Sequence, residues 1–343
     1  MIPHRFGSSE PFTVGIEEEL FCLDAETLAP APFPREALDG ARLKEELFTS
    51  VVELNTGIHA TAAEAVEELQ GLRERAKATA GKAGLVLAGA GTWPTAVPEE
   101  QEIGPNEGLR KFVDYAGSSA RRQYCSGLHV HVGMTSPEAC IAALEAVLPW
   151  LPLVLAVSAN SPYLAGRESG LRSTRAEILT LLPRAGAPPV FASYADWETF
   201  AETLVELGLA GHVRRIWWDV RPHPTLGTLE VRMPDQPTRL EATLALATAI
   251  RAMVAALKPD GPAHRGYYVQ NRWAASRFGH DADLVHPDGS RLLSVRGLLD
   301  QLANLAGEEG VAQLRELDQA GEQLELGRAE GLEALCRRLV ALT

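Results

Sequence analysis

Three consecutive glutamates interrupt an otherwise strand-like stretch near the start of the chain, in the string GIEEEL at residues 15–20. In a β-strand, positions i and i+2 lie on the same face, about 7 Å apart. Glu17 and Glu19 would therefore point the same way and repel each other unless a cation lies beside them. Carboxylates in this arrangement supply the hard oxygen ligands that Mg²⁺ prefers. Glu18 should point to the opposite face, at a strand end or an edge, as a solvated or paired carboxylate.

Three other strand-like stretches carry ionisable residues at the same i, i+2 spacing. The pairs are His129 and His131, Asp219 and Arg221, and Glu230 and Arg232. The alternate positions in these stretches are mostly valine, leucine, isoleucine or tryptophan. An antiparallel sheet commonly has one apolar face under helices and one polar face. We therefore predict a sheet whose polar face gathers Glu, His, Asp and Arg side chains in one cleft.

This predicted face combines groups that bind cations with groups that bind anions. Glu53, in the string VVELNT, and Glu230 add carboxylates that could share divalent ions with phosphate oxygens. Arg221 and Arg232 suit the phosphate itself, because a guanidinium group binds an oxyanion through two parallel hydrogen bonds.

Each pattern also has a simpler interpretation when it is taken alone. The acids at 17 and 19 could protect an exposed edge strand from aggregation, and Arg232 could form only a salt bridge with Glu230. The HxH spacing of His129 and His131 also occurs in zinc sites, so a zinc-dependent hydrolase is an alternative function. The placement of all four patterns on one face favours a shared site.

Strands and helices must bring these residues together. Strand-like patterns cover residues 12–24, 50–57, 85–91, 127–134, 215–224 and 227–235. Helical patterns cover residues 61–83, 137–159, 195–210, 238–258, 266–279 and most of 290–342. Scattered strands with short returns favour an α+β fold with a largely antiparallel sheet. Without a low-complexity linker, we expect a single catalytic domain over residues 1–343, with a helical C-terminal part from about 284.

The composition argues against several classes of function. The net charge of −13 and the pI near 5.2 do not suit a nucleic-acid partner. The most apolar stretch, 146–159, is too short to span a membrane and reads as a buried helix. Four cysteines without metal or disulfide spacing indicate a cytoplasmic protein. The apolar stripe of residues 292–305 could pack on the core or form a homo-oligomer contact.

Four strings of the chain together resemble one known enzyme family. They are VGIEEELFCLD (14–24), GLHVHVGM (127–134), WWDVRPHPTLGTLEVRMPD (217–235) and NRWAASRFG (271–279). In order and spacing they resemble the type 2 glutamate–cysteine ligases, also called carboxylate–amine ligases. The matching segments run from about residue 12 to about residue 283.

The resemblance implies a glutamine-synthetase-like fold, in which a curved antiparallel sheet forms a funnel and helices pack on its outer face. It also implies ATP and divalent metals, Mg²⁺ or Mn²⁺, on the inner face. The implied metal ligands are Glu17, Glu19, Glu53, His129 and Glu230. The implied nucleotide-binding residues are Arg232, Arg221, Asn271 and Arg272. The candidates for substrate binding are His131, Arg167, Arg172 and Arg175. Catalytic roles are expected for Arg232, Glu53 and His129.

The implied reaction is ATP-driven amide formation, as in glutathione biosynthesis. The γ-carboxylate of glutamate would attack the γ-phosphate to give an acyl phosphate and ADP, and an amine such as cysteine would then displace phosphate.

Two departures from the family pattern concern the substrates. Residues 173–175 read Ser-Thr-Arg where many members have Ser-Tyr-Arg, and residues 270–272 read Gln-Asn-Arg where many have Glu-Asn-Arg. A different acid or amine, or a non-catalytic ATP-binding relative, are therefore alternatives.

Overall fold

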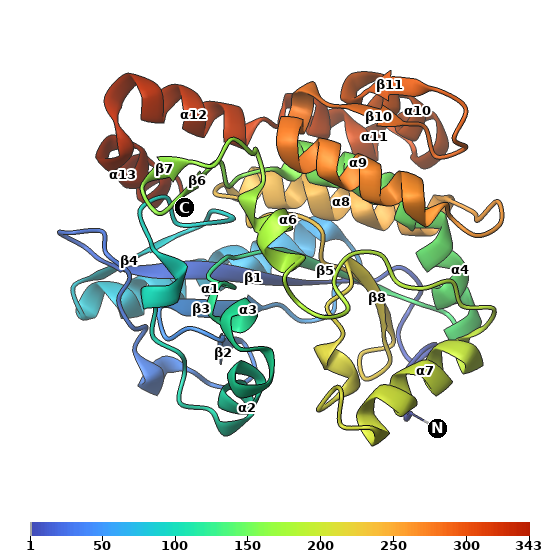
Figure 1. Cartoon of the computed structure of the whole chain (residues 1–343), viewed down its shortest axis with the longest axis horizontal. Coiled ribbons are helices and arrows are strands. Elements are labelled where there is room, and N and C mark those ends of the chain that lie inside the picture. Colours follow the sequence, from blue (N-terminus) through green and yellow to red (C-terminus); the bar gives the residue numbers. More distant parts are fainter. Residues whose placement is uncertain (1) are drawn as a thin grey trace.

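The computed structural model describes residues 2–343, and a seven-stranded sheet lies at its centre (Figure 1). The order of its strands is β2-β3-β1-β5-β9-β8, and β4 pairs with the far end of β1. Every pairing in this sheet is antiparallel. The strands are β1 (Val14–Asp24), β2 (Leu43–Glu45), β3 (Val51–Asn55), β4 (Leu85–Ala88), β5 (Leu128–Gly133), β8 (Val220–His223) and β9 (Thr228–Val231).

Strand β1 is the centre of this sheet. It pairs with β3 on one side, and on the other side with β5 along its first half and with β4 at its far end. In this register Glu17 lies opposite His129, and Glu19 lies opposite Glu53. The alternative of an acidic edge strand is therefore wrong, because both edges of β1 are hydrogen-bonded.

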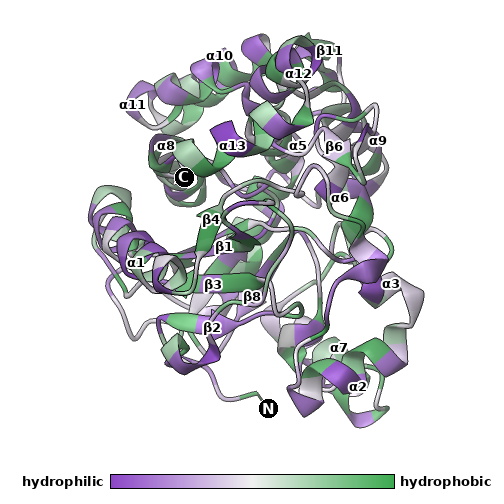
Figure 2. Ribbon diagram, turned by 90° about the vertical axis from the view of Figure 1, so that its left-hand side faces the viewer, coloured by the Kyte–Doolittle hydropathy of each residue, from purple (hydrophilic) through white to green (hydrophobic). Residues whose placement is uncertain are grey.

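Helices cover the apolar face of the sheet. Figure 2 shows α1 (Ala62–Lys82) on this side of the strands. Helix α2 (Glu107–Ala116) lies on the opposite side, toward the polar face. A side-chain cap begins α1, since the hydroxyl of Thr61 accepts a hydrogen bond from the backbone N–H of Glu64. Helix α8 (Leu240–Ala256) lies beside α1 and contributes buried alanine, leucine and isoleucine side chains to the same core.

Glu18 points into this apolar face. Its carboxylate accepts two hydrogen bonds from Arg73 of α1, at 2.7 and 2.9 Å, and one from the hydroxyl of Thr243 of α8, at 2.6 Å. Both charged side chains are almost completely buried. The prediction of a paired carboxylate is confirmed, whereas its placement at a strand end or an edge is wrong.

The most apolar stretch of the chain is part of the core, as the sequence predicts. Residues 146–159 cover the end of α4 (Pro137–Val147), a 3₁₀ turn at Leu148–Trp150 and α5 (Leu151–Ser158), so the stretch is buried as predicted but is not one continuous helix. Among the described residues, only Pro137–Ser158 is long and apolar enough to cross a membrane. However, 89% of its most apolar 18-residue segment is buried inside the protein. Its hydropathy therefore reflects packing against the sheet and α8.

The remaining elements surround this layer. The helices are α3 (Ser118–Arg121), α6 (Thr174–Leu179), α7 (Tyr194–Glu206), α9 (Arg265–Phe278), α10 (Val295–Ala306), α11 (Glu308–Val311), α12 (Gln319–Glu330) and α13 (Leu332–Leu342). Two small hairpins pair β6 (Tyr163–Leu164) with β7 (Arg167–Glu168) and β10 (Asp283–Val285) with β11 (Leu292–Ser294).

The predicted elements are present, with shifted ends. The sequence did not predict α2, a ten-residue helix, or β2, α3, α6 and the two hairpins, whose elements span six residues or fewer. The helix expected from residue 290 begins at Val295, because residues 292–294 pair with β10. The assignment of residues 1–343 to one domain stays a prediction.

Candidate active site

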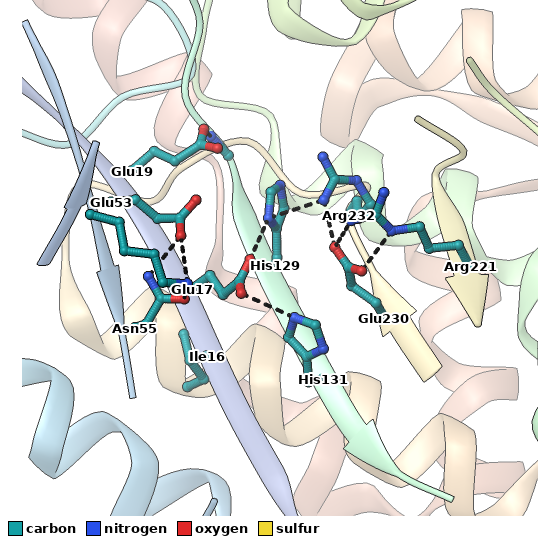
Figure 3. A network of polar contacts seen from close by, with 12 residues as sticks. Ile16, Glu17, Glu19, Glu53, Asn55, His129, His131, Arg221, Glu230 and Arg232 are labelled. Atoms are coloured by element: carbon teal, nitrogen blue, oxygen red, sulfur yellow. Dashed lines mark hydrogen bonds and ion pairs between the residues drawn. The ribbon is translucent and has the colours of Figure 1, made fainter. Parts of the chain in front are cut away.

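The polar face of the sheet gathers the predicted acids, histidines and arginines (Figure 3). Cross-strand register explains the arrangement, because directly opposite side chains on one face lie close together. Glu230 lies opposite His131 on one neighbouring strand and opposite Arg221 on the other. The structure therefore brings together Glu17, Glu19, Glu53, His129, His131, Arg221, Glu230 and Arg232.

Three carboxylates, from Glu19, Glu46 and Glu53, form one cluster, which we call the glutamate triad. One oxygen of each lies within 4.8 Å of the others. A carboxylate oxygen of Glu19 accepts a 2.6 Å hydrogen bond from the backbone N–H of Gly127, and Glu53 accepts one from Lys44 at 3.2 Å. These contacts neutralise only part of the triad's charge.

The pKa values of the three glutamates reflect this incomplete neutralisation. Burial raises the pKa of Glu19 to about 7, against the lowering effect of Arg175. Burial, with repulsion from Glu19 and Glu53, raises the pKa of Glu46 to about 8. Burial and the charge of Glu17 raise the pKa of Glu53 as well. A divalent cation would keep all three ionised, so the donor set fits a hard metal ion such as Mg²⁺.

A second group combines Glu17, His131 and Glu230, and it also places one ligand atom of each residue within 4.8 Å of the others. The carboxylate of Glu17 lies between two imidazoles, 3.2 Å from Nδ1 of His129 and 3.5 Å from Nε2 of His131. Burial raises the pKa of Glu17, but the two histidines outweigh it and hold the pKa well below its usual range. Burial, aided by the charge of Arg232, lowers the pKa of His129 to about 4.

Glu230 is already neutralised by two arginines. It accepts hydrogen bonds from Arg221 at 2.7 and 3.1 Å and from Arg232 at 2.5 Å. Burial raises its pKa, but the two guanidinium groups outweigh burial and hold the pKa well below its usual range. The salt bridge expected between Arg232 and Glu230 is present, and Nη1 of Arg232 also lies 3.4 Å from Nδ1 of His129.

Two cavities open onto this face. The Trp217 cavity has a volume of about 200 Å³, and its polar lining comprises Glu19, Glu46, Gln123, Cys125, His129, Arg175, Arg215 and Arg232. Its apolar lining comprises Leu47, Leu109, Phe112, Leu179, Leu182 and Trp217. The Lys44 cavity has a volume of about 310 Å³ and includes Glu17, Arg42, Lys44, Asn55, His131 and Thr228 in its lining.

Of the three arginines at residues 167–175 that the sequence singles out, only Arg175, in α6, lines one of these cavities. It is 3% exposed and donates hydrogen bonds to the backbone carbonyls of Met233 and Arg232, each at 3.2 Å. A Cβ atom at position 127 would lie 2.0 Å from its Nη2, so the close approach requires Gly127.

Seven predicted residues line neither cavity. Glu53, Arg221 and Glu230 still belong to the polar face, whereas the other four lie away from it. Arg167 is exposed in β7, and Arg172 pairs with Asp281 at 3.1 Å. The side-chain amide of Asn271 exchanges two 2.7 Å hydrogen bonds with the backbone of Val285. Their predicted roles in binding nucleotide or substrate gain no support from these positions.

Arg272, the last of these four residues, is buried between α6 and α9. Its guanidinium donates to the carboxylate of Asp219 at 2.9 Å and to the backbone carbonyl of Ala176 at 2.6 Å. Asp219 also accepts a hydrogen bond from the hydroxyl of Tyr268 at 2.6 Å. This group holds α6, which carries Arg175, against α9.

Sequence reasoning missed Glu46 and Lys44. Both lie in or directly after β2, a three-residue strand that is too short to show a clear alternating pattern. Their i, i+2 spacing in the string LKEELF was the only signal, and it acquires meaning only through the pairing of β2 with β3.

Comparison with solved structures shows the fold. The chain is similar to the glutamate–cysteine ligase of Francisella tularensis, solved in complex with AMP, with a TM-score of 0.70, 14% identity and coverage of 97% of this chain and 89% of that one. It is also similar to a bifunctional glutathione synthetase from Pasteurella multocida, with a TM-score of 0.63, 15% identity and coverage of 96% of this chain and 50% of that one. The predicted fold class is confirmed.

Sequence comparison shows the family. The model of the glutamate–cysteine ligase family 2 matches residues 13–335. A candidate glutamate–cysteine ligase 2-3 of Rubrobacter xylanophilus is 38% identical over 305 residues, 87% of this chain and 84% of that protein. A candidate glutamate–cysteine ligase 2 of Sorangium cellulosum is 36% identical over 333 residues, 92% of this chain and 89% of that protein.

These matches define the class of protein as an ATP-dependent ligase that forms amide bonds. The chain belongs to the glutamate–cysteine ligase family 2. The resemblance noted in the four sequence strings is thereby confirmed.

Proposed function

We propose that this chain joins the γ-carboxylate of glutamate to the amine of an amino acid such as cysteine, with ATP as the energy source and an acyl phosphate as the intermediate. The observation that carries the proposal is the lining of the Trp217 cavity. Two members of the glutamate triad and the guanidinium of Arg232 face the same cavity, which suits a metal-bound phosphate group.

The glutamate triad is the proposed metal site. Glu19, Glu46 and Glu53 would hold Mg²⁺, or Mn²⁺, through carboxylate oxygens that are already close together. When bound, the ion would offset the negative charge of the phosphates during phosphoryl transfer. The Glu17, His131 and Glu230 group is the weaker candidate, because Arg221 and Arg232 already neutralise Glu230.

Arg232 is the proposed contact to the transferred phosphoryl group. Its side chain is fixed by Glu230, which Arg221 holds in turn, so the charge is positioned before substrate binds. Such preorganisation avoids reorganisation during the reaction. Arg175, buried in the same cavity, is the proposed partner of a substrate carboxylate.

The reaction then proceeds in two steps. An oxygen of the substrate carboxylate bonds to the γ-phosphorus, and the bond to the bridging oxygen of ADP breaks. The amine nitrogen next attacks the acyl carbon, loses a proton and expels phosphate, which leaves an amide. Positioning and charge stabilisation carry both steps.

The test is an assay of ADP release with ATP, Mg²⁺, glutamate and a panel of amines headed by cysteine. We expect ADP release to depend on both the acid and one amine, and the amide to appear in equal amount. ATP binding without ADP release from any acid–amine pair would refute the proposal and favour a non-catalytic relative.

The zinc-dependent hydrolase has no support from the family assignment. The local charges also oppose it, because Arg232 lies beside His129, and a cationic neighbour disfavours a bound zinc ion. Retention of stoichiometric zinc after purification would revive this alternative.

Several further expectations stay predictions. They are the cytoplasmic location, a role in glutathione biosynthesis, small-molecule substrates as the only partners, and a homo-oligomeric state. The two departures from the family strings, at residues 173–175 and 270–272, concern substrate binding. The substrate panel therefore tests the identities of the acid and the amine most directly.

A further inference from the structure

The apolar part of the Trp217 cavity takes no part in the proposed contacts to metal and phosphate. Its side chains come from four separate segments of the chain, which are α2, the end of α6 with the residues after it, the residues after β2, and the residues before β8. They face the same cavity as Glu19 and Glu46 of the glutamate triad. We call this set the apolar wall, and it comprises Leu47, Leu109, Phe112, Leu179, Leu182 and Trp217.

The apolar wall has accessible surface that a ligand could cover. Leu109, Leu179 and Trp217 are only half-buried, although each lines the cavity. The rings of Phe112 and Trp217 lie 4.8 Å apart between centroids and are tilted by 39°, so they form a joined aromatic surface. An apolar group that lies against this surface would remove it from water, and this burial favours binding.

The glutamate triad borders both cavities of the polar face. The Trp217 cavity includes Glu19, and the Lys44 cavity includes Glu17, which lies two residues earlier in β1. Glu53, also of the triad, accepts hydrogen bonds from Lys44 at 3.2 Å and from Asn55 at 2.7 Å. Both of these donors line the Lys44 cavity, and the two cavities share no described lining residue. A phosphate group at the triad would therefore have a separate cavity on either side.

The sizes of the two cavities favour different ligands. At about 200 Å³, the Trp217 cavity is smaller than a typical small-molecule site, so it does not suit a nucleoside in addition to a phosphate. The Lys44 cavity, at about 310 Å³, offers more space for the rest of the nucleotide. The apolar wall is then left for the second substrate, which is the amine.

One cation of the Trp217 cavity has no acidic partner among the described residues. The side chain of Arg215 donates a 2.7 Å hydrogen bond from Nη2 to the backbone carbonyl of Gly108. Its guanidinium carbon lies 5.9 Å from the centre of the Phe112 ring, beside the apolar wall. A half-buried guanidinium group without an acid suits the carboxylate of a ligand.

We propose that the amine acceptor is an α-amino acid with a large apolar side chain, aromatic or branched aliphatic. The side chain would lie against the apolar wall, the carboxylate would pair with Arg215, and the amine would face the acyl phosphate beside the glutamate triad. This inference rests on the proposed reaction, because it names the class of its second substrate. Cysteine, with its small side chain, would leave most of the wall in contact with water.

The test compares three acceptors in the ADP-release assay with ATP, Mg²⁺ and glutamate. They are phenylalanine, alanine, which lacks the phenyl group, and 2-phenylethylamine, which lacks the carboxylate. We expect kcat/KM for phenylalanine to be at least about tenfold higher than for either analogue, because one methylene group in an apolar pocket already changes kcat/KM about 10–200-fold. Equal kcat/KM for phenylalanine and either analogue would overturn the proposal.

Variants of the wall and of the cation test the assigned contacts. Leu179→Ala should lower kcat/KM for phenylalanine at least about tenfold and leave KM for ATP unchanged. Leu181→Ala is the matched control, because Leu181 is exposed and lines neither cavity. Arg215→Gln should lower kcat/KM for phenylalanine but not for 2-phenylethylamine, a split that a purely structural role would not produce.

Two results with these variants would contradict the proposal. A raised KM for ATP in Leu179→Ala, with unchanged phenylalanine kinetics, would mean that the wall holds the adenine ring. Equal losses for both amines in Arg215→Gln would mean that the guanidinium does not bind the carboxylate. If Leu179→Ala does not fold, Leu109→Ala replaces it, because Leu109 is half-buried in the same wall on α2.

A binding measurement separates this inference from the proposed reaction. Ligand-observed NMR would follow phenylalanine and alanine with the full-length protein, Mg²⁺ and a non-hydrolysable ATP analogue. Binding of phenylalanine but not alanine, without ADP release from any acid–amine pair, would refute the reaction and support the apolar site. ADP release that is as efficient with cysteine or alanine as with phenylalanine would support the reaction and refute this inference.

Discussion

Glu18 and Glu19 are neighbours in β1 and both are buried, yet their environments differ completely. Glu18 points into the apolar face, where Arg73 and Thr243 supply three hydrogen bonds and a full countercharge. Glu19 points to the polar face, where burial raises its pKa to about 7 and its hydrogen bond to Gly127 offsets only part of this cost.

The difference shows that the partners of a buried carboxylate decide its role. A paired acid such as Glu18 has no remaining capacity for a ligand and contributes to the fold. An acid that is only partly neutralised, among other acids, has a large capacity to bind a cation. We therefore expect substitutions on the two faces of β1 to separate activity from stability.

The largest effect is expected from Glu19→Ala, which removes one carboxylate of the glutamate triad. ADP release should fall at least about 1,000-fold, equivalent to about 4 kcal/mol of transition-state stabilisation. The melting temperature should stay the same or rise, because a poorly neutralised buried acid is lost. The exposed Glu67→Ala is the matched control, and normal turnover by Glu19→Ala would refute the metal assignment.

Glu18→Ala should have the opposite signature. It leaves the guanidinium of Arg73 buried without its countercharge, and breaking such a pair costs about 3–5 kcal/mol. Urea unfolding would measure this loss, while kcat of the protein that remains folded should change little. A double variant, Glu18→Leu with Arg73→Met, should recover most of the stability; a loss below 1 kcal/mol in Glu18→Ala would contradict the structural role.

Thr243→Val is a smaller perturbation of the buried Glu18–Arg73 pair. It removes the 2.6 Å hydrogen bond to Glu18 with little change in volume, and hydrogen bonds to charged groups contribute about 1.5–3 kcal/mol. The free energy of unfolding should fall by that amount, with ADP release unchanged. Thr248→Val on the same helix serves as the control, and an equal loss in both variants would argue against a specific role for this hydrogen bond.

The smallest effect is expected from Glu46→Gln, on the polar face. The triad would keep its shape but lose one negative charge, so the Mg²⁺ concentration for half-maximal ADP release should rise about tenfold, or about 1.4 kcal/mol. Glu45→Gln is the control, because Glu45 pairs with Arg35 outside the triad. An unchanged Mg²⁺ requirement would mean that Glu46 is no metal ligand.

Much of the sheet and most of the polar face could be predicted because alternation is a local property. The i, i+2 spacing of Glu17 and Glu19, and of His129 and His131, reports the face of each strand whatever lies next to it. The helix at 61–83 was readable for the same reason, since its apolar stripe repeats within the element. The family strings added the expectation that these separate strands meet.

The sequence by itself determined which residues share a face, the α+β class and the family. Only the tertiary structure decided that Glu46 completes the triad, that Arg73 neutralises Glu18, and that Asn271 and Arg272 lie in structural contacts away from the two cavities. The physical reason is that side-chain periodicity is encoded within a few residues. Charge compensation, by contrast, depends on strand register and on partners far away in the chain, which no local pattern specifies.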